Sequence, residues 1–348
     1  MNLNSRKKAL NLILIAIIVM LFASSSSLII NSNAAIASNV NCKINVCAYV
    51  SEVEAVVVIS GTKIVKLVEN TNLTACCQEG WDNITGMVIV PGYSSALIIN
   101  ASTNKIFKQV YSSTFNFPEG ALYNPVTNVV LVTNSGSDTL TVINATTWKA
   151  ESKTITVGDG QEEPSFLAYN PANKEIYVSL RTRDFQYCGD NVTVLSASTD
   201  KVIKVISVGY CPAGIAFNPT NNETYVGNEG SATVSVISLA NKVIKTITLH
   251  NSASPWGLNY GNGNIYVCDR QLFGNNAIYI ISSTNKFREI SGFSGNPIAA
   301  AYDPVNRYEY VVAFSTGQVQ ILIGTKISFH KFDLNDGPSG IITTANLP

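Results

Sequence analysis

The sequence predicts an all-β fold, a seven-bladed β-propeller with four-stranded blades. Beyond residue 40, short runs rich in Val, Ile, Thr and Tyr alternate with Gly, Asn, Pro and Ser, and no long stretch has a helical period. Prolines that open each group of runs stand at positions 118, 164, 212, 255, 297 and 338, so the repeats are 46, 48, 43, 42 and 41 residues long. Four strands in every ~40–50 residues are typical of a propeller blade.

Five repeats supply complete blades, each with an inner strand that begins at its proline. They span residues 118–157, 164–208, 212–249, 255–290 and 297–332. Residues 71–111 form a divergent blade, whose inner strand is either supplied by residues 71–82 or absent. Residues 45–69 supply three strands without an inner one, whereas Pro338 opens an inner strand without a blade. We therefore expect the C-terminal strand to join the N-terminal blade and close the ring, which removes exposed sheet edges.

The strand sequences inside the repeats resemble those of a known family. The runs VLVTN, IYVSL, TYVGN and IYVCD are followed by strands like T-V-x-V-I and then by K-V-I-K-x-I. This pattern is similar to that of the YVTN family of β-propeller repeats. The resemblance implies a seven-bladed propeller of the cell surface or periplasm, as in surface-layer proteins of archaea and bacteria. It implies no catalytic residues, because the family supplies no catalytic motif to transfer.

The N-terminal segment has the order of a secretory signal. A basic cluster at residues 6–8 precedes an apolar stretch, and small residues near Ala37 offer a cleavage site. We expect residues 1–37 to be a signal peptide and residues 38–348 to be a single propeller domain. The alternative is an uncleaved membrane anchor at residues 9–30, which is long enough to span a bilayer. Either reading predicts an extracellular, cell-surface protein.

The charge balance narrows the functional classes. The 348 residues include 23 basic and 23 acidic side chains, and charged residues make up 13% of the chain. Nucleic-acid binding by phosphate neutralisation needs a basic surplus that this composition lacks. His250 and His330 are the two histidines, and the acidic turns at residues 158–164 and 333–338 lack the spacing of calcium loops. We therefore expect no cofactor and no metal site.

The most informative charges lie in two loops. In a propeller, the loops that join second to third strands share one face with the connections between blades, and such concave faces favour ligands. The loops at residues 181–190 and 269–276 are longer than their counterparts and hold three of the five arginines that follow residue 37. Arginine binds anionic groups in a forked geometry, and adjoining aromatic rings stack on sugars or bases. The candidate ligand-binding residues of this rim are Arg181, Arg183, Asp184, Phe185, Tyr187, Trp256, Asp269, Arg270 and Phe273. Alternatively, Arg181 and Arg183 pair with Asp184 and Asp190 and only order their loop.

Disulfides are expected in an exported chain. The cysteines are Cys42, Cys47, Cys76, Cys77, Cys188, Cys211 and Cys268. Cys188 and Cys211 lie in neighbouring loops of one face, so we expect them to pair. We expect Cys42 and Cys47 to pair with Cys76 and Cys77 in an open order, although Cys76 and Cys77 could bridge each other. Cys268 is then left over as a small buried side chain. Export also makes glycosylation possible at the sequons of Asn72, Asn83, Asn100, Asn144, Asn191 and Asn222.

These features predict a non-catalytic, extracytoplasmic binding scaffold whose partner is a cell-surface protein or glycan. A second reading is an enzyme of the lyase or quinoprotein kind, with its active site at the mouth of the channel. A third is single-stranded nucleic-acid binding, in which Phe185, Tyr187 and Phe273 stack on bases beside the arginines. Convergence of the rim arginines without carboxylate partners would favour an anion, glycan or nucleic-acid site.

Overall fold

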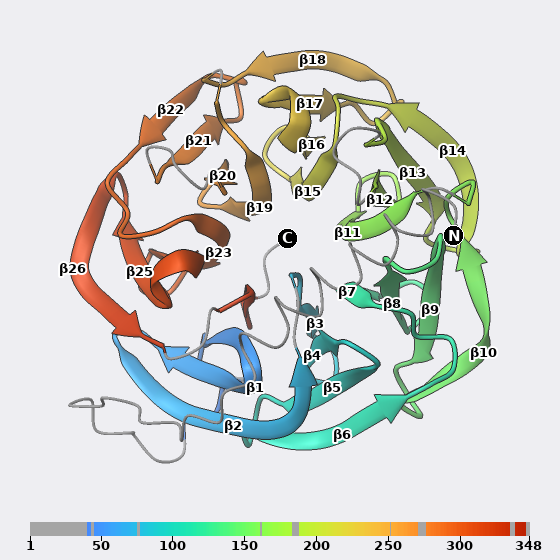
Figure 1. Ribbon diagram of the computed structural model, residues 1–348, viewed down its shortest axis with the longest axis horizontal. Coiled ribbons are helices and arrows are strands. Elements are labelled where there is room, and N and C mark those ends of the chain that lie inside the picture. The colour runs from blue at the N-terminus through green and yellow to red at the C-terminus, as the bar shows by residue number, and fades with distance from the viewer. Residues whose placement is uncertain are drawn as a thin grey trace, which may run out of the picture. The chain divides into compact units, whose positions relative to one another are not determined.

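The seven-bladed β-propeller is confirmed. The computed structural model describes residues 40–42, 45–74, 77–160, 162–182, 188–250, 252–270, 276–334 and 338–345, and they form seven antiparallel sheets arranged as the blades of a ring (Figure 1). Residues 33–348 belong to one compact unit. The predicted signal peptide lies outside the described residues. Within the described part of the chain, no helix has the length and apolar character needed to cross a membrane.

Blades 2 to 7 are four-stranded meanders of consecutive strands, with the inner strand first. Blade 2 comprises β3 (Gly80–Asp82), β4 (Met87–Gly92), β5 (Ser95–Asn100) and β6 (Lys105–Tyr111). Blade 3 comprises β7 (Pro118–Asn124), β8 (Val129–Asn134), β9 (Thr139–Asn144) and β10 (Lys149–Thr156). Blade 4 comprises β11 (Glu163–Asn170), β12 (Glu175–Arg181), β13 (Asn191–Ser196) and β14 (Lys201–Ser207). Blade 5 comprises β15 (Pro212–Asn218), β16 (Glu223–Asn228), β17 (Thr233–Ile237) and β18 (Val243–Thr248). Blade 6 comprises β19 (Pro255–Gly261), β20 (Asn264–Asp269), β21 (Ile278–Ser282) and β22 (Phe287–Ile290). Blade 7 comprises β23 (Pro297–Asp303), β24 (Tyr308–Ala313), β25 (Gln318–Ile323) and β26 (Lys326–Asp333). Short 3-10 turns follow the second strands of blades 5 and 7, at η1 (Glu229–Ser231) and η2 (Phe314–Thr316).

Blade 1 is built from both ends of the chain, as predicted. Its inner strand is β27 (Gly340–Thr343), which pairs antiparallel with the first part of β1 (Ala48–Ser60), and the second part of β1 pairs with β2 (Lys63–Thr74). Glu54 has a left-handed φ of 63° between these parts. The Ser60 hydroxyl donates to the Val46 carbonyl at 3.5 Å, so the second part of β1 returns beside the first. The ring therefore closes through backbone pairing of its two ends.

The divergent blade 2 obtains its inner strand from β3, within the stretch predicted to supply it. The preceding Gln78 anchors this short strand through its side-chain amide. Its Nε2 donates to the Leu167 carbonyl at 2.8 Å, and its Oε1 accepts from the Leu167 amide at 2.9 Å. This amide reaches past blade 3 to the inner strand of blade 4, and Gln78 also bridges to Gly120 of β7. These contacts compensate for the shortness of β3.

Glycine two residues after the repeat proline lets neighbouring inner strands approach closely. A Cβ atom on Gly120, Gly214 or Gly257 would lie 2.4, 2.3 or 2.2 Å from a carbonyl oxygen of the next blade's inner strand. Such separations are far shorter than any real contact of a side-chain carbon, so only glycine fits there. The repeat therefore specifies backbone contact around the channel as well as strand length.

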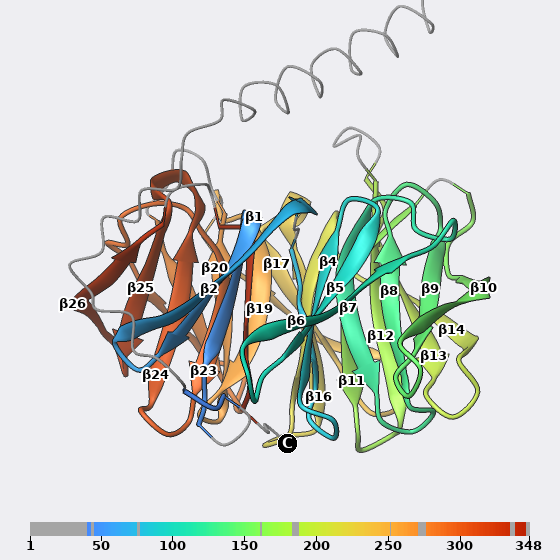
Figure 2. The same cartoon turned by 90° about the horizontal axis from the view of Figure 1, so that it is seen from below.

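The strand ends gather at two opposite ends of the blades, seen edge-on in Figure 2. Turns between first and second strands, and between third and fourth strands, lie at one end, which we call the turn face. The loops between second and third strands and the connections between blades lie at the other end, the loop face. This division separates the two surfaces considered below.

One of the two predicted disulfide arrangements is confirmed. Cys188 and Cys211 are bonded, and they join the loop after β12 in blade 4 to the segment that opens blade 5. Cys268 is free and buried, and burial raises the pKa of its thiol, with further contributions from the nearby Glu309 and Asp269 charges. A buried thiol that resists ionisation is a packing residue rather than a nucleophile.

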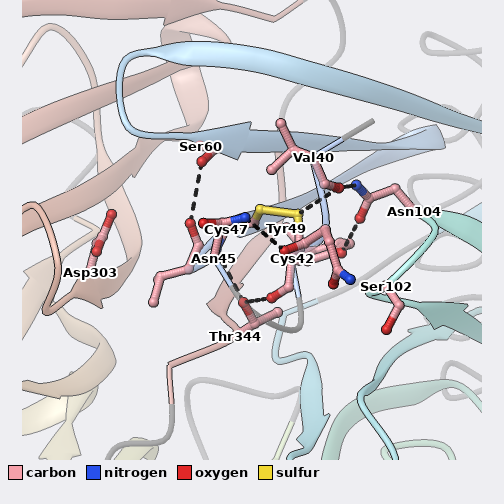
Figure 3. Close-up of a disulfide and its surroundings, with 12 residues drawn as sticks. Val40, Cys42, Asn45, Cys47, Tyr49, Ser60, Ser102, Asn104, Asp303 and Thr344 are labelled. Atoms are coloured by element: carbon pink, nitrogen blue, oxygen red, sulfur yellow. Dashed lines mark hydrogen bonds between the residues drawn. A yellow bond between two sulfur atoms is a disulfide. The ribbon is translucent and has the colours of Figure 1, made fainter. Parts of the chain in front are cut away.

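The predicted pairing of Cys42 and Cys47 with Cys76 and Cys77 is wrong. Cys42 is bonded to Cys47, with their Cα atoms 5.3 Å apart (Figure 3). The Cys47 amide donates to Thr344 Oγ1 at 3.1 Å, and that hydroxyl donates to the Cys42 carbonyl at 2.7 Å. The small loop therefore packs against the residue that follows β27 and fastens the ring closure. Cys77 is disulfide-bonded, and Cys76 lies outside the described residues.

Candidate binding site at the channel mouth

Two of the rim arginines meet over one tryptophan. Arg181 ends β12 of blade 4, Arg270 follows β20 of blade 6, and Trp256 is the second residue of β19. The guanidinium carbons of Arg181 and Arg270 lie 4.5 and 3.7 Å from the centroid of the Trp256 ring. Both distances are within the range of cation–π attraction. The two arginines therefore converge at the mouth although blade 5 lies between their blades.

Glutamates of the neighbouring blades neutralise these arginines. Glu229 of η1 places Oε1 2.9 Å from Arg270 Nη2 and Oε2 3.8 Å from Arg181 Nη1. Glu119 of β7 places Oε1 3.9 Å from Arg181 Nη2. The Ser254 hydroxyl donates to Glu229 Oε1 at 3.0 Å. We name Glu119, Arg181, Glu229, Trp256 and Arg270 the mouth cluster.

The described partners of the arginines come from other blades. Arg181 pairs with Glu119 and Glu229, and its candidate partner Asp184 lies outside the described residues. Asp269 Oδ1 accepts from the Ser254 amide at 2.8 Å. Burial lowers the pKa of Arg270, and the Glu229 charge opposes that change. Glutamates therefore balance the charges of Arg181 and Arg270 within the described residues.

The floor of the mouth is apolar. Phe166, Ala213, Trp256 and Ile298, from the inner strands of blades 4 to 7, belong to one buried cluster. The Phe166 ring meets Trp256 edge-on, with centroids 5.6 Å apart. Trp256 is 4% exposed, so its ring supports the arginines from below and is not an open platform for sugars or bases.

Several rim candidates lie outside the described residues. They are Arg183, Asp184, Phe185, Tyr187 and Phe273. The side chain of Asn72, one of the sequon asparagines, is also outside the described part. The roles predicted for these residues stay predictions.

Unsatisfied acceptors at the mouth were missed from the sequence. The Oε2 atoms of Glu119 and Glu229 are buried without a hydrogen-bond donor among the described residues. A third such oxygen belongs to Glu79, whose other oxygen accepts from the Ser51 hydroxyl. Burial raises the pKa of Glu79 to about 8, although its hydrogen bonds lower it. Glu79-Gly80 and Glu119-Gly120 occupy the same place in two inner strands, and aligning blade 2 with blade 3 would have revealed this pair of acids.

An acidic patch adjoins the mouth cluster on the loop face between blades 3 and 4. Burial raises the pKa of Glu162, and the neighbouring Asp159, Asp138 and Asp190 charges raise it further, against a hydrogen bond from Asn191. Charges shift a neighbour's pKa in this way over short distances, so these acids lie near Glu162. Negative charge is therefore concentrated at the loop face between blades 3 and 4.

The described residues offer little for metal or histidine chemistry. Within them, no group of three or more His, Cys, Asp or Glu side chains could hold a metal ion. Residues 161 and 335–337 of the two acidic turns lie outside the described part. His250 follows the outer strand β18 and pairs with Glu289 at 2.8 Å, and His330 lies on the outer strand β26. Neither histidine has a described contact with the mouth cluster.

The fold and the mouth place the chain in the class of seven-bladed β-propellers with a polar channel mouth. No protein-family model matches the chain, and none of the curated proteins matches it. Among solved structures, a chain of Kuenenia stuttgartiensis Hydrazine Synthase is similar with a TM-score of 0.67 and 18% identity, over 78% of this chain and 90% of that chain. Streptogramin B lyase is similar with a TM-score of 0.66 and 16% identity, over 85% and 91%. At these identities the likeness shows the fold alone.

Proposed function

We propose that the protein is a non-catalytic, extracytoplasmic propeller of the YVTN type that binds a cell-envelope partner at its channel mouth. The observation that carries the proposal is the set of buried glutamate oxygens without donors in the mouth cluster. A buried acceptor without a donor costs about 1–3 kcal/mol. A ligand recovers that cost when the carboxylates turn toward the opening to meet its donors, because the oxygens themselves are buried. The two described disulfides fit an oxidising, extracytoplasmic location.

The chemistry of the mouth favours a donor-rich ligand. A Lys or Arg side chain of a partner protein, or the hydroxyl groups of a glycan, would complete the bonds of Glu119 and Glu229. A phosphate or carboxylate would meet arginines that are already paired and carboxylates that repel it. Single-stranded nucleic acid is therefore disfavoured, since the acidic patch adjoins the path its phosphates would take.

Glu119 is the residue on which to test this proposal. A labelled protein lacking residues 1–32 is titrated onto isolated cell envelopes, and Glu119→Gln is compared with Glu151→Gln, which removes an exposed carboxylate from the outer strand β10. We expect saturable binding that weakens about tenfold or more in the first variant and stays unchanged in the second, because one charged hydrogen bond is lost. Protease-sensitive binding identifies a protein partner, and periodate-sensitive binding a glycan. Equal binding by both variants would refute the mouth as the binding site.

A second candidate function is an enzyme with its active site at the mouth. Its support is Glu79, a buried acid at the mouth whose pKa of about 8 suits proton transfer near neutral pH. Hydrazine synthase and streptogramin B lyase are named as enzymes with this fold. Mass spectrometry of envelope material incubated with the protein decides the matter: a released product that disappears with Glu79→Gln would support catalysis, and unchanged material would favour binding alone.

A further inference from the structure

Lysine occupies one equivalent position in every blade. It is the first residue after the turn that leads into the outermost strand, and it is exposed in all seven blades. These residues are Lys63, Lys105, Lys149, Lys201, Lys242, Lys286 and Lys326. The turns share their geometry, because a residue with left-handed φ precedes the lysine directly or by two positions, as Asn241 and Gly324 illustrate. We call this set the lysine ring.

The lysine ring lies at one level of the propeller. Each member stands at the turn-face end of its outer strand, and the outer strands occupy the circumference (Figure 1). Because the blades repeat around one axis, equivalent positions share the same height along it. Seven positive charges therefore border the turn face in a plane. Lys174 and Arg307, in turns of the same face, are also exposed and basic.

Five carboxylates of the turn face accept hydrogen bonds from within the fold. Glu175 Oε2 accepts from Asn241 Nδ2 at 2.8 Å, and Glu223 Oε2 accepts from Asn285 Nδ2 at 3.0 Å. Asp82 and Asp303 are buried and accept from backbone amides of their own turns. Asp200 is half-buried and accepts from Asn124 Nδ2 at 2.9 Å. These bonds occupy the acids and leave the basic side chains toward solvent.

Exposed apolar side chains lie in the turns that the lysine ring surrounds or borders. Ile84 is 62% and Val305 72% exposed in turns between first and second strands. Val126 occupies the equivalent turn of blade 3, and Leu239 lies in the turn before Lys242; each is 43% exposed. Apolar tips among basic side chains suit the boundary between lipid headgroups and acyl chains.

We propose that the turn face docks on the surface of an anionic lipid bilayer. A flat anionic layer can contact all seven lysines at once, since they share a plane, whereas a linear polyanion would have to follow a circle to do so. Each basic side chain close to an anionic membrane adds an electrostatic attraction, and these contributions sum over all the basic residues near the surface. The acidic loop face points away from the lipid in this orientation, which leaves the mouth cluster open to its partner. The proposal does not depend on the proposed function, because the two surfaces lie at opposite ends of the blades.

Vesicle co-sedimentation of the chain without residues 1–32 tests the proposal. The remaining residues form a compact unit, and removal of the N-terminal stretch excludes insertion of that apolar segment. We expect binding to phosphatidylcholine vesicles that contain phosphatidylglycerol, weaker binding at high salt, and none to pure phosphatidylcholine. The triple variant Lys201→Gln, Lys242→Gln, Lys286→Gln should lose about tenfold or more in affinity.

A matched control removes three lysines that lie farther along outer strands, Lys66→Gln, Lys153→Gln, Lys331→Gln. This variant changes net charge equally, so it should bind nearly as well as the unmodified protein. An equal loss in both triple variants would overturn the proposal in favour of attraction by net charge. Binding to soluble alginate without binding to anionic vesicles would overturn it in favour of an acidic polysaccharide. Absence of vesicle binding at low salt would also overturn it, and unchanged thermal unfolding verifies that the variants are folded.

Discussion

Glu309 is expected to make the folded protein less stable as the pH rises above neutral. It lies on β24 of blade 7 and is buried against blade 6, where its Oε1 accepts from Asn259 Nδ2 at 2.6 Å. Its Oε2 has no hydrogen-bond donor among the described residues. Burial raises the pKa of Glu309 from 4.5 to about 8, although the bond from Asn259 lowers it. The folded protein therefore retains this proton at a pH where the unfolded chain has released it.

The sign of the effect follows from proton linkage. Between about pH 4.5 and pH 8 the folded state binds one proton more than the unfolded state at this site. The contribution of this proton to the free energy of unfolding is therefore complete below that window and is lost as the pH rises through it. A difference of this size between folded and unfolded pKa corresponds to at most about 5 kcal/mol of unfolding free energy. Glu79, also raised to about 8, acts in the same direction.

Glu309→Gln removes the proton and keeps the shape of the side chain. At low pH the variant should be within about 1 kcal/mol of the unmodified protein, since the protonated carboxyl and the amide each leave a donor at this position without an acceptor. At about pH 9 the variant should be the more stable of the two, because the unmodified protein then carries a buried charge. Thermal unfolding followed by circular dichroism across this range measures both, with Glu69→Gln on the exposed part of β2 as control. Parallel curves for Glu309→Gln and the unmodified protein would refute the reasoning.

Three further perturbations test the packing and the mouth. Gly257→Ala puts a carbon 2.2 Å from the Ile298 carbonyl, so we expect a loss of about 1–3 kcal/mol in denaturant unfolding, and an unchanged midpoint would contradict the close approach. Glu229→Gln removes the negative charge that faces both mouth arginines and should lower the free energy of unfolding by about 2 kcal/mol, measured as a lower unfolding midpoint. A more stable variant would show that these ion pairs do not stabilise the fold. Cys188→Ser should lower the thermal midpoint by several °C through loss of the bond to Cys211, and non-reducing peptide mapping that finds no such bond in the parent would exclude this explanation.

The fold was predictable because its determinants are local and repeated. Each proline fixes the start of an inner strand, and each turn residue ends a strand after about six residues. The closure by β27 followed from counting strands at the two ends. The pairing of Cys188 with Cys211 followed from two loops of one face in adjacent blades. None of these inferences requires a distance between side chains of different blades.

The mouth was only partly predictable because it depends on such distances. The sequence located Arg181, Arg270 and Trp256 on one rim, but their partners, Glu119 and Glu229, come from blades 3 and 5. Which carboxylate reaches an arginine depends on the angle between blades and on the stagger of their strands. The spacing of residues along the sequence determines neither of these. Proximity in the sequence indicates only local partners such as Asp184 and Asp190, and it carries no information about carboxylates from other blades.

The balanced composition conceals an ordered distribution of charge. Acids concentrate at the loop face and lysines at the starts of the outer strands, so the two faces differ in sign while the total is zero. The number of charged residues does not reveal this distribution, because the face on which a charge lies depends on its position in the blade. The repeat provides that position, since a residue at a fixed offset from the outer turn lies at the same height along the propeller axis in every blade. One lysine per repeat is unremarkable as composition, but seven at the same offset define a plane, and a plane is a surface that a membrane can match.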